Sequence, residues 1–179
     1  MSPAPIPSGV QGFFDYQFHQ VAIFTADQGA ALWQYYKLGY EKWIHDTAEL
    51  KGLLHGEEVV TKADMAFNYD IMPMELEFLT YHGPNRHAQE GRNGRIPFIS
   101  HMSVYVDDVR AESTLLAKNH ELVPYHRFIT QNHSNPNVVG KKRFIECIYD
   151  TRGLLGYDLK LIQKVAWDFN DDDWLKYKI

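Results

Sequence analysis

The sequence has few of the features that mark whole classes of protein. Cys147 is the only cysteine, so no disulfide can form within the chain and nothing points to an oxidising compartment. No apolar run approaches the roughly 20 residues that a membrane-spanning helix needs. The Pro- and Gly-rich start has neither the basic segment nor the long apolar stretch of a signal peptide. We therefore expect a cytoplasmic protein with no membrane partner.

Charge and nucleotide-binding motifs are equally sparse. The formal net charge is −5, and the basic residues form no stripe that would neutralise a series of phosphates, so nucleic acid is not expected as a partner. The sequence has no GxGxxG or Walker-type loop, which gives no support to a nucleotide-cofactor enzyme. The remaining expectation is a small-molecule substrate or ligand.

A pattern of elements that occurs twice is the main positive feature. A strand from Phe14 to Thr25 is followed by Asp27 as N-cap of the helix AALWQYYKL and then by the strands EKWIHDTAEL, TKADMAFNYDIM and MELEFLTY. In the second half ISHMSVYV is a strand, Asp108 caps the helix VRAESTLLAKNHEL, and strands follow at PYHRFITQ, KKRFIECIYD and YDLKLIQ. Each half thus predicts the order βαβββ.

The predicted organisation is one structural domain with internal parts. Residues 1–13 are a flexible arm, 14–82 the first module, 83–97 a linker loop and 98–164 the second module, and the tail 165–179 contains a short helix.

Aligned segments support a duplication. PMELEFLT aligns with GYDLKLIQ and pairs Glu77 with Lys160, while QVAIFTAD aligns with HMSVYVDD and pairs Gln20 with His101. The two pairs have nearly the same spacing along the chain, as an internal repeat requires.

Tandem βαβββ modules with these strand signatures resemble the vicinal-oxygen-chelate superfamily, which includes glyoxalase I, methylmalonyl-CoA epimerase, extradiol dioxygenases and the fosfomycin and bleomycin resistance proteins. The resemblance covers roughly residues 14–164. It implies an α+β fold in which two tandem modules form a curved mixed-sheet half-barrel around a central cleft. It also implies a homodimer.

Metal ligands in that family come from the first and last strand of each module. The resemblance therefore assigns Gln20, Glu77 and His101 as ligands of a divalent Fe, Mn, Ni, Co or Zn ion. The adjacent His19 points to the opposite face of its strand and misses the site. The remaining ligand position, where the family has a second carboxylate, holds Lys160.

Several roles remain open for Lys160. A protonated lysine would repel a metal ion, although Asp158, two residues away on the same face, can replace the missing ligand. Alternatively Lys160 pairs with Glu77 in the metal's place. It can also act, once desolvated, as a general base or Schiff-base nucleophile, or serve only as a structural or exposed strand residue.

We expect Glu77, Lys160 and His101 to be the catalytic residues. Aromatic wall candidates for the substrate are Phe24, Tyr81, Tyr105 and Tyr149. Cys147 is expected to pack as a small apolar residue. The other histidines show no metal-binding spacing and are assigned to the surface or to loops; they are His45, His55, His82, His87, His120, His126 and His133.

The resemblance favours a glyoxalase- or dioxygenase-like enzyme, an isomerase, lyase or oxygenase, that acts on a small oxygenated organic molecule through a non-standard site. Extradiol dioxygenase chemistry is disfavoured because Gln20 stands where one of the iron's histidines belongs. The alternative is a non-catalytic binding or resistance protein of the same fold without metal, which the departure at Lys160 favours.

Overall fold

Eight strands and five helices make up the described parts of the protein. The structure is a computed structural model that describes residues 16–92, 97–131 and 143–179, so the predicted arm and His133 lie outside the described residues. The strands are β1 (Gln20–Phe24), β2 (Ile44–Leu54), β3 (Glu57–Asn68), β4 (Glu75–His82), β5 (Phe98–Tyr105), β6 (His126–Gln131), β7 (Arg143–Tyr149) and β8 (Asp158–Val165). The helices are α1 (Gln28–Tyr36), α2 (Arg86–Arg92), α3 (Val109–His120), α4 (Arg152–Leu155) and α5 (Asp172–Leu175).

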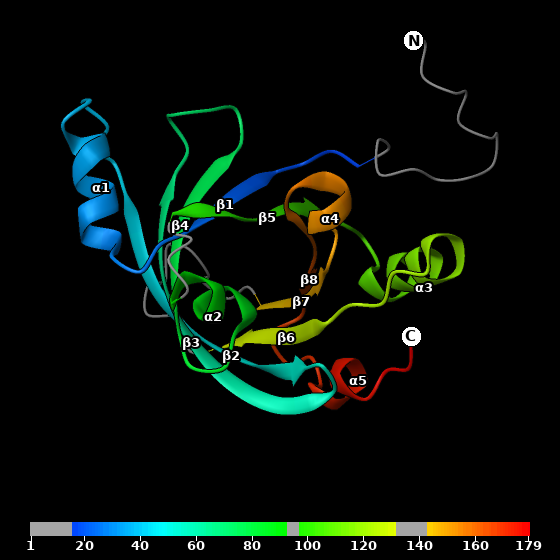
Figure 1. Ribbon diagram of the computed structural model, residues 1–179. Helices are drawn as coiled ribbons and strands as arrows, with labels where there is room; N and C mark the ends of the chain where they lie inside the picture. Colours follow the sequence, from blue (N-terminus) through cyan, green and yellow to red (C-terminus); the bar gives the residue numbers. More distant parts are fainter. Residues whose placement is uncertain (1–15, 93–96, 132–142) are drawn as a thin grey trace, which may run out of the picture.

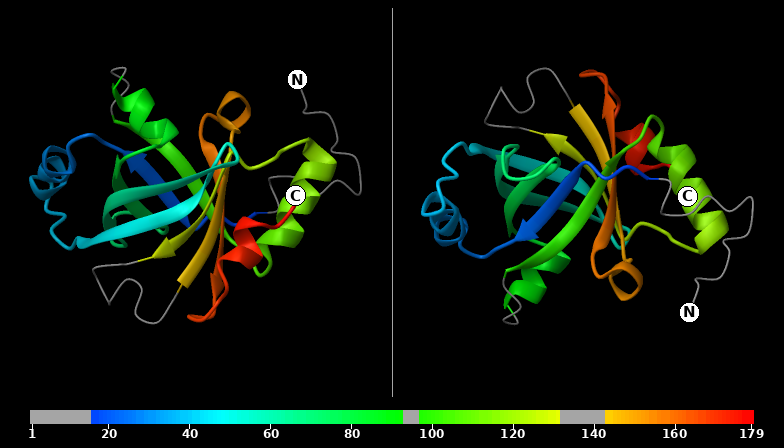
Figure 2. Two further views of the ribbon diagram at one scale, coloured as in Figure 1. Left: turned by 90° about the horizontal axis from the view of Figure 1, so that it is seen from below. Right: turned by 90° about the horizontal axis from the view of Figure 1, so that it is seen from above.

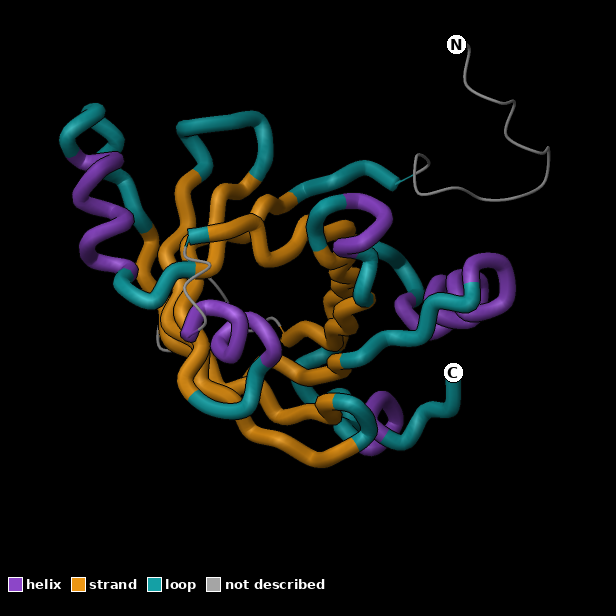
Figure 3. The backbone as a smooth tube through the Cα atoms, viewed as in Figure 1, coloured by secondary structure: helices purple, strands orange, loops and turns teal. Residues whose placement is uncertain are grey.

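The strands close into one barrel in the order β1-β4-β3-β2-β6-β7-β8-β5 (Figure 1; the tube in Figure 3 shows the ring of strands end-on). The pairs β1–β4 and β5–β8 are parallel, and the other neighbouring pairs are antiparallel. This confirms an α+β fold with a mixed sheet. The predicted half-barrel is wrong, because the sheet has no open side. The duplication of one module stays a prediction.

The barrel closes at the pairing of β2 with β6. Gly52 on β2 pairs with Phe128 on β6, and a Cβ atom at Gly52 would lie only 2.1 Å from the carbonyl oxygen of Arg127 and 2.6 Å from Cβ of Phe128. Only glycine lets the two strands approach this closely. Closure therefore depends on a residue without a side chain, a feature that the hydrophobic pattern does not reveal.

The two long helices begin where the sequence predicted. The Asp27 carboxylate accepts a hydrogen bond from the backbone N–H of Ala30 at 2.9 Å. The Asp108 carboxylate accepts from the N–H groups of Arg110 and Ala111 at 2.9 and 3.1 Å. Both aspartates satisfy donors that the first helical turn leaves unpaired, which confirms them as N-caps.

Two of the short helices, α2 and α5, come from segments that were predicted as the linker and the tail. Residues 86–92 of the predicted linker form α2, which lies against one end of the barrel in the two views of Figure 2. The tail forms α5, whose Trp174 is completely buried. No helix in the described ranges is long and apolar enough to cross a membrane.

Strand alternation divides the core between the two faces of the sheet. Inward-facing residues such as Ala22, Phe67 and Phe128 form one cluster inside the barrel. Outward-facing residues such as Cys147 and Leu161 pack outside it with α3 and the tail. Cys147 is fully buried there, which confirms it as a packing residue.

Candidate active site in the barrel

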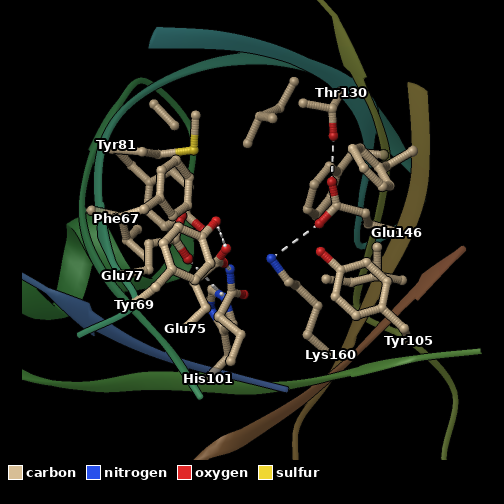
Figure 4. A pocket seen from close by; sticks show the side chains of 18 residues that line it. Phe67, Tyr69, Glu75, Glu77, Tyr81, His101, Tyr105, Thr130, Glu146 and Lys160 are labelled. Carbon is tan, nitrogen blue, oxygen red and sulfur yellow. Dashed lines mark hydrogen bonds and ion pairs between the residues drawn. The ribbon is translucent and has the colours of Figure 1, made fainter. Parts of the chain in front are cut away.

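A cavity of about 220 Å³ lies inside the barrel (Figure 4). Its walls come from strands of both halves of the chain. The side chains in its wall that carry a charge, an amide or an imidazole are Gln20, Glu75, Glu77, His101, Glu146 and Lys160. The half-exposed Tyr69 and Tyr105, at 55% and 45% exposure, stand where the cavity meets solvent.

Glu77 is the carboxylate with the most unusual surroundings. It lies on β4 with its side chain in the barrel, and it is 4% exposed. Its Oε2 atom is buried and has no hydrogen-bond partner among the described residues. Burial raises the pKa of Glu77 to about 8, against the lowering effect of Lys160 and with the help of Glu75 and Glu146. This carboxyl group can therefore gain or lose a proton near neutral pH.

Lys160 is held by a carboxylate that the sequence analysis did not single out. Its Nζ lies 3.0 Å from Oε2 of Glu146 on β7, and the Thr130 hydroxyl donates to the other carboxylate oxygen of Glu146 (Figure 4). Burial by itself lowers the pKa of Lys160, but the negative charges of Glu146, Glu77 and Glu75 outweigh it and leave that pKa raised. Lys160 is thus a fixed ammonium ion.

Gln20 is already engaged by protein groups. The Ser103 hydroxyl donates to its Oε1 at 2.6 Å, and its Nε2 donates to Glu75. Tyr69 donates to the second oxygen of Glu75. The amide oxygen that would serve as a metal ligand is therefore used inside the site.

His101 lies on β5, and its side chain faces Glu77 inside the barrel. Its Nε2 lies 3.5 Å from Oε2 of Glu77, and its Nδ1 lies 2.8 Å from the Ser100 hydroxyl. Burial, with Lys160 and His87 adding positive charge nearby, holds the pKa of His101 well below its usual value. The ring is therefore neutral at physiological pH.

The structure brings most of the predicted site residues together. Gln20, Glu77, His101 and Lys160 all line the cavity, as do the predicted wall residues Tyr81 and Tyr105. The partner predicted for Lys160 is wrong in detail, because the ammonium contacts Glu146 instead of Glu77.

Three predicted residues lie away from the cavity. Phe24 points into the barrel but stacks on Tyr81 and Phe98 nearer the α2 end. Tyr149 is on the outer face of β7, where its hydroxyl donates to Ser113, so its assignment as a wall residue is wrong. Asp158 is fully buried beside His87 and does not line the cavity, so it cannot replace Lys160 as a ligand.

Two histidines that were assigned to the surface or to loops are completely buried. His87 on α2 bonds Asp158 and Ser100, and both ring nitrogens of His126 lack a partner among the described residues. His45, His55 and His82 are exposed as expected. Sequence alternation around His126 would have indicated its inward direction, whereas His87 gave no signal because its helix was read as a loop.

Glu146 could have been found by the argument used for Glu77. It stands between Ile145 and Cys147 in an apolar strand, and a carboxylate in such a strand needs a partner when its face is covered.

The donor set does not fit a divalent metal. Gln20 Oε1 already accepts a hydrogen bond, so Glu77 and His101 are the predicted ligands that keep free donor atoms, and the Lys160 ammonium acts on both of those residues. Within the described ranges no group of three or more His, Cys, Asp or Glu side chains could hold a metal ion. As they are arranged here, Gln20, Glu77 and His101 do not form a ligand set for a divalent metal ion.

Comparison with known proteins confirms the class of fold. No family model matches the sequence, and no curated protein matches it. Solved structures match over most of the chain, and their fold is that of the vicinal-oxygen-chelate superfamily, which the sequence resemblance indicated.

Particular structures make the comparison concrete. Methylmalonyl-CoA epimerase from Mycobacterium tuberculosis is 13% identical with a TM-score of 0.51, and the match covers 82% of this chain and 86% of that one. A methylmalonyl-CoA epimerase in complex with methylmalonyl-CoA and NH4+ is also 13% identical with a TM-score of 0.51, over 83% of this chain and 94% of that one. A variant of 4-hydroxymandelate synthase from Streptomyces coelicolor is 11% identical with a TM-score of 0.51, over 89% of this chain and 53% of that one. At these identities the likeness shows the fold alone.

Proposed function

We propose that the protein is an enzyme that moves a proton on the carbon next to a carbonyl group of a small oxygenated molecule, as an isomerase or lyase does. The observation that carries this proposal is the buried, unpartnered Oε2 of Glu77 in the wall of the cavity that the Lys160 ammonium also lines. In the reaction Glu77 takes the proton, the electrons of the broken C–H bond pass to the carbonyl oxygen, and the proton returns to the substrate carbon.

Glu77 suits the role of general base and general acid. A catalytic group works best when its pKa lies near the operating pH. Burial raises the pKa of Glu77 to about 8, so both protonation states are populated at neutral pH. The same burial removes water that would otherwise compete for the enolate.

Lys160 suits the role of oxyanion stabiliser. The Glu146 carboxylate fixes its ammonium in the cavity, and a fixed positive charge next to a developing oxyanion lowers the barrier most in a dry site. Its raised pKa keeps it protonated, which favours this role over a neutral amine that forms a Schiff base. One epimerase of the same fold is described with an ammonium ion, a cation of the same chemistry.

The cavity favours a neutral, unsaturated substrate. Glu75, Glu77 and Glu146 face a single lysine, so an anionic ligand would meet net negative charge. The apolar walls include Phe67, Phe128 and Phe144 together with several tyrosines, which suit a planar group. A small aryl ketone combines a planar apolar part with an enolisable carbonyl.

The test is exchange of carbon-bound hydrogen in D2O, followed by proton NMR, with phenylacetone and 2-hydroxyacetophenone as probes. We expect exchange with the wild-type protein and a loss of at least about 100-fold in Glu77→Gln. The matched control is Glu57→Gln, the same substitution at an exposed position of β3. Exchange that persists in Glu77→Gln would refute Glu77 as the base.

A non-catalytic binding protein is the second candidate. The mutual neutralisation of Lys160 and Glu146 favours it, because a satisfied ion pair can line a binding site without taking part in a reaction. Probe binding, seen as line broadening in the same spectra, without exchange would support this candidate and contradict the enzyme.

A further inference from the structure

A chain of buried side chains leads from Glu77 to the end of the barrel that α2 covers. Glu77 Oε2 faces His101 Nε2 at 3.5 Å, and His101 Nδ1 lies 2.8 Å from the Ser100 hydroxyl. The same hydroxyl lies 2.9 Å from Nδ1 of His87, whose Nε2 lies 2.9 Å from Asp158 Oδ2. All five side chains are at most 4% exposed, so water does not compete for these contacts.

A β-bulge in β5 makes this series of side-chain contacts possible. Ser100 and His101 are adjacent on β5, and regular alternation would place them on opposite faces of the sheet. The pairing register of β1 with β5 shifts from Ala22–His101 to Ile23–Ile99, which leaves Ser100 without a partner residue on β1. Bulges re-aim side chains next to active sites, and this one turns the Ser100 hydroxyl toward both imidazole rings.

Asp158 is the last residue in this series of side-chain contacts, and it holds His87 in place. Its Oδ2 accepts hydrogen bonds from the Tyr125 hydroxyl at 2.9 Å and from the Arg152 guanidinium at 3.2 Å, besides its contact with His87. Burial raises the pKa of Asp158, but the contacts with His87, Tyr125 and Arg152 outweigh it and leave that pKa lowered. An ionised Asp158 requires a hydrogen on Nε2 of His87, so only Nδ1 of that ring can change its protonation.

We propose that His101, Ser100 and His87 form a proton relay that exchanges a proton with the carboxyl group of Glu77 and so connects the cavity to the α2 end of the barrel. The inference rests on the proposed catalytic function of Glu77. It adds a path by which a protonated Glu77 can lose its proton and so become the base.

The hydrogen count of the relay allows two complete arrangements. In the first, His87 carries hydrogens on both nitrogens, Ser100 donates to His101 Nδ1, and His101 Nε2–H points at an ionised Glu77. In the second, Glu77 is protonated, His101 carries its hydrogen on Nδ1 and donates to Ser100, and Ser100 donates to His87 Nδ1. Both contain the same number of hydrogens.

One concerted step converts the first arrangement into the second. His87 Nδ1 gives its proton to the Ser100 oxygen, Ser100 gives its own to His101 Nδ1, and His101 Nε2 gives its own to Glu77. Three bonds to hydrogen break and three form, and His101 carries a single hydrogen both before and after the step. The lowered pKa of His101 agrees with a ring that changes tautomer and stays neutral.

The contact between His101 Nε2 and Glu77 Oε2, at 3.5 Å, is the longest step of the relay. It exceeds the usual 2.7–3.2 Å of an N–H···O bond, and both atoms lack a partner in the part of the chain that the structure describes. Catalytic hydrogen bonds are often long without substrate and shorten in the complex. The relay then exchanges a proton with Glu77 when the site is filled.

Several ionisable groups surround the relay. Lys160, Glu75 and Glu146 act on Glu77, and His126 acts on His87. Tyr81, Tyr125 and Arg152 lie beside Glu77 or Asp158. A change at any of these groups shifts the titration of the whole unit, so the test below substitutes members of the relay only.

The test follows the relay directly, without substrate, in the full-length protein with 15N-labelled histidine. Nitrogen–proton spectra against pH report the hydrogens on His87 and His101, and the infrared carbonyl band of the protonated carboxyl group reports Glu77. We expect the Nδ1 signal of His87 to change together with the Glu77 band. In Glu77→Gln this step should vanish.

Substitution of Ser100, the middle residue of the relay, tests whether proton transfer through its hydroxyl couples His87 to Glu77. In Ser100→Ala the Glu77 band should still titrate while the His87 signal no longer follows it. The matched control is Ser113→Ala, another completely buried serine that lies outside the barrel. A second variant, His87→Gln, keeps a donor for Asp158 but cannot carry a proton, and it should move the midpoint of the Glu77 band.

Two results would overturn the relay: a wild-type His87 signal that does not follow Glu77, or coupling that survives in Ser100→Ala. Because no substrate is used, a confirmed relay with no hydrogen exchange would refute the proposed function alone, and exchange without coupling would refute the relay alone.

Discussion

Replacement of Glu77 by Gln should stabilise the folded protein at high pH. The pKa of Glu77 is raised from 4.5 to about 8 on folding, so the folded state holds a proton there that the unfolded state has lost. Such a group contributes its full stability below pH 4.5, and this contribution is lost as the pH rises toward 8. At roughly 1.4 kcal/mol per pKa unit, the loss amounts to about 5 kcal/mol. Gln is neutral at every pH and avoids this loss.

The assay is urea unfolding of both proteins at several pH values from 5 to 9 (roughly the window in which the group titrates). The difference in unfolding free energy between Glu77→Gln and wild type should grow steadily up to about pH 8 and then level off. Other titrating groups largely cancel in this difference because both proteins share them. Parallel stability curves would refute the reasoning and show that Glu77 titrates like an exposed carboxylate.

The other predictions concern the ion pair, the barrel seam and metal binding. Lys160→Met should destabilise the protein by about 3–5 kcal/mol in urea unfolding, because it leaves Glu146 buried without its ion-pair partner. The double variant Lys160→Met with Glu146→Gln should recover much of this loss. If the double variant were as unstable as Lys160→Met alone, that result would contradict a direct ion pair. Gly52→Ala should lower stability by at least about 3 kcal/mol in thermal unfolding through the clash with β6, whereas the control Gly153→Ala, which has open space, should change it by less than about 0.5 kcal/mol. Addition of Mn, Fe, Ni, Co or Zn should leave the melting temperature unchanged, and stoichiometric metal that His101→Ala abolishes would refute the metal-free site.

Much of the fold could be predicted because it follows from local patterns. The caps at Asp27 and Asp108 are local hydrogen bonds, and the inward direction of Gln20 follows from strand alternation. The closed barrel could not be predicted in this way. It depends on the approach of β2 to β6, which are far apart in the sequence and meet at Gly52.

The site divides in the same manner. The aligned strands and the family resemblance pointed to Glu77, His101 and Lys160, and all three line the cavity. The partner of Lys160 was missed because Glu146 lies on the neighbouring strand β7, and the sequence does not show which side chains of two strands meet. Tyr149 was misplaced because proximity in the sequence does not fix the face of a strand to which a side chain points.

The sequence by itself thus determined most of the elements, the starts of the two long helices and the side chains that share a face of a regular strand, since these depend on backbone geometry within a few residues. Only the tertiary structure decided which of those side chains meet. The closed barrel put the Lys160 ammonium against Glu146, left the Glu77 carboxyl group without a partner, and placed His87 from a misread linker beside Asp158. Each of these contacts joins separate elements, and burial, which sets the charge of each group, exists only once all of the strands are in place.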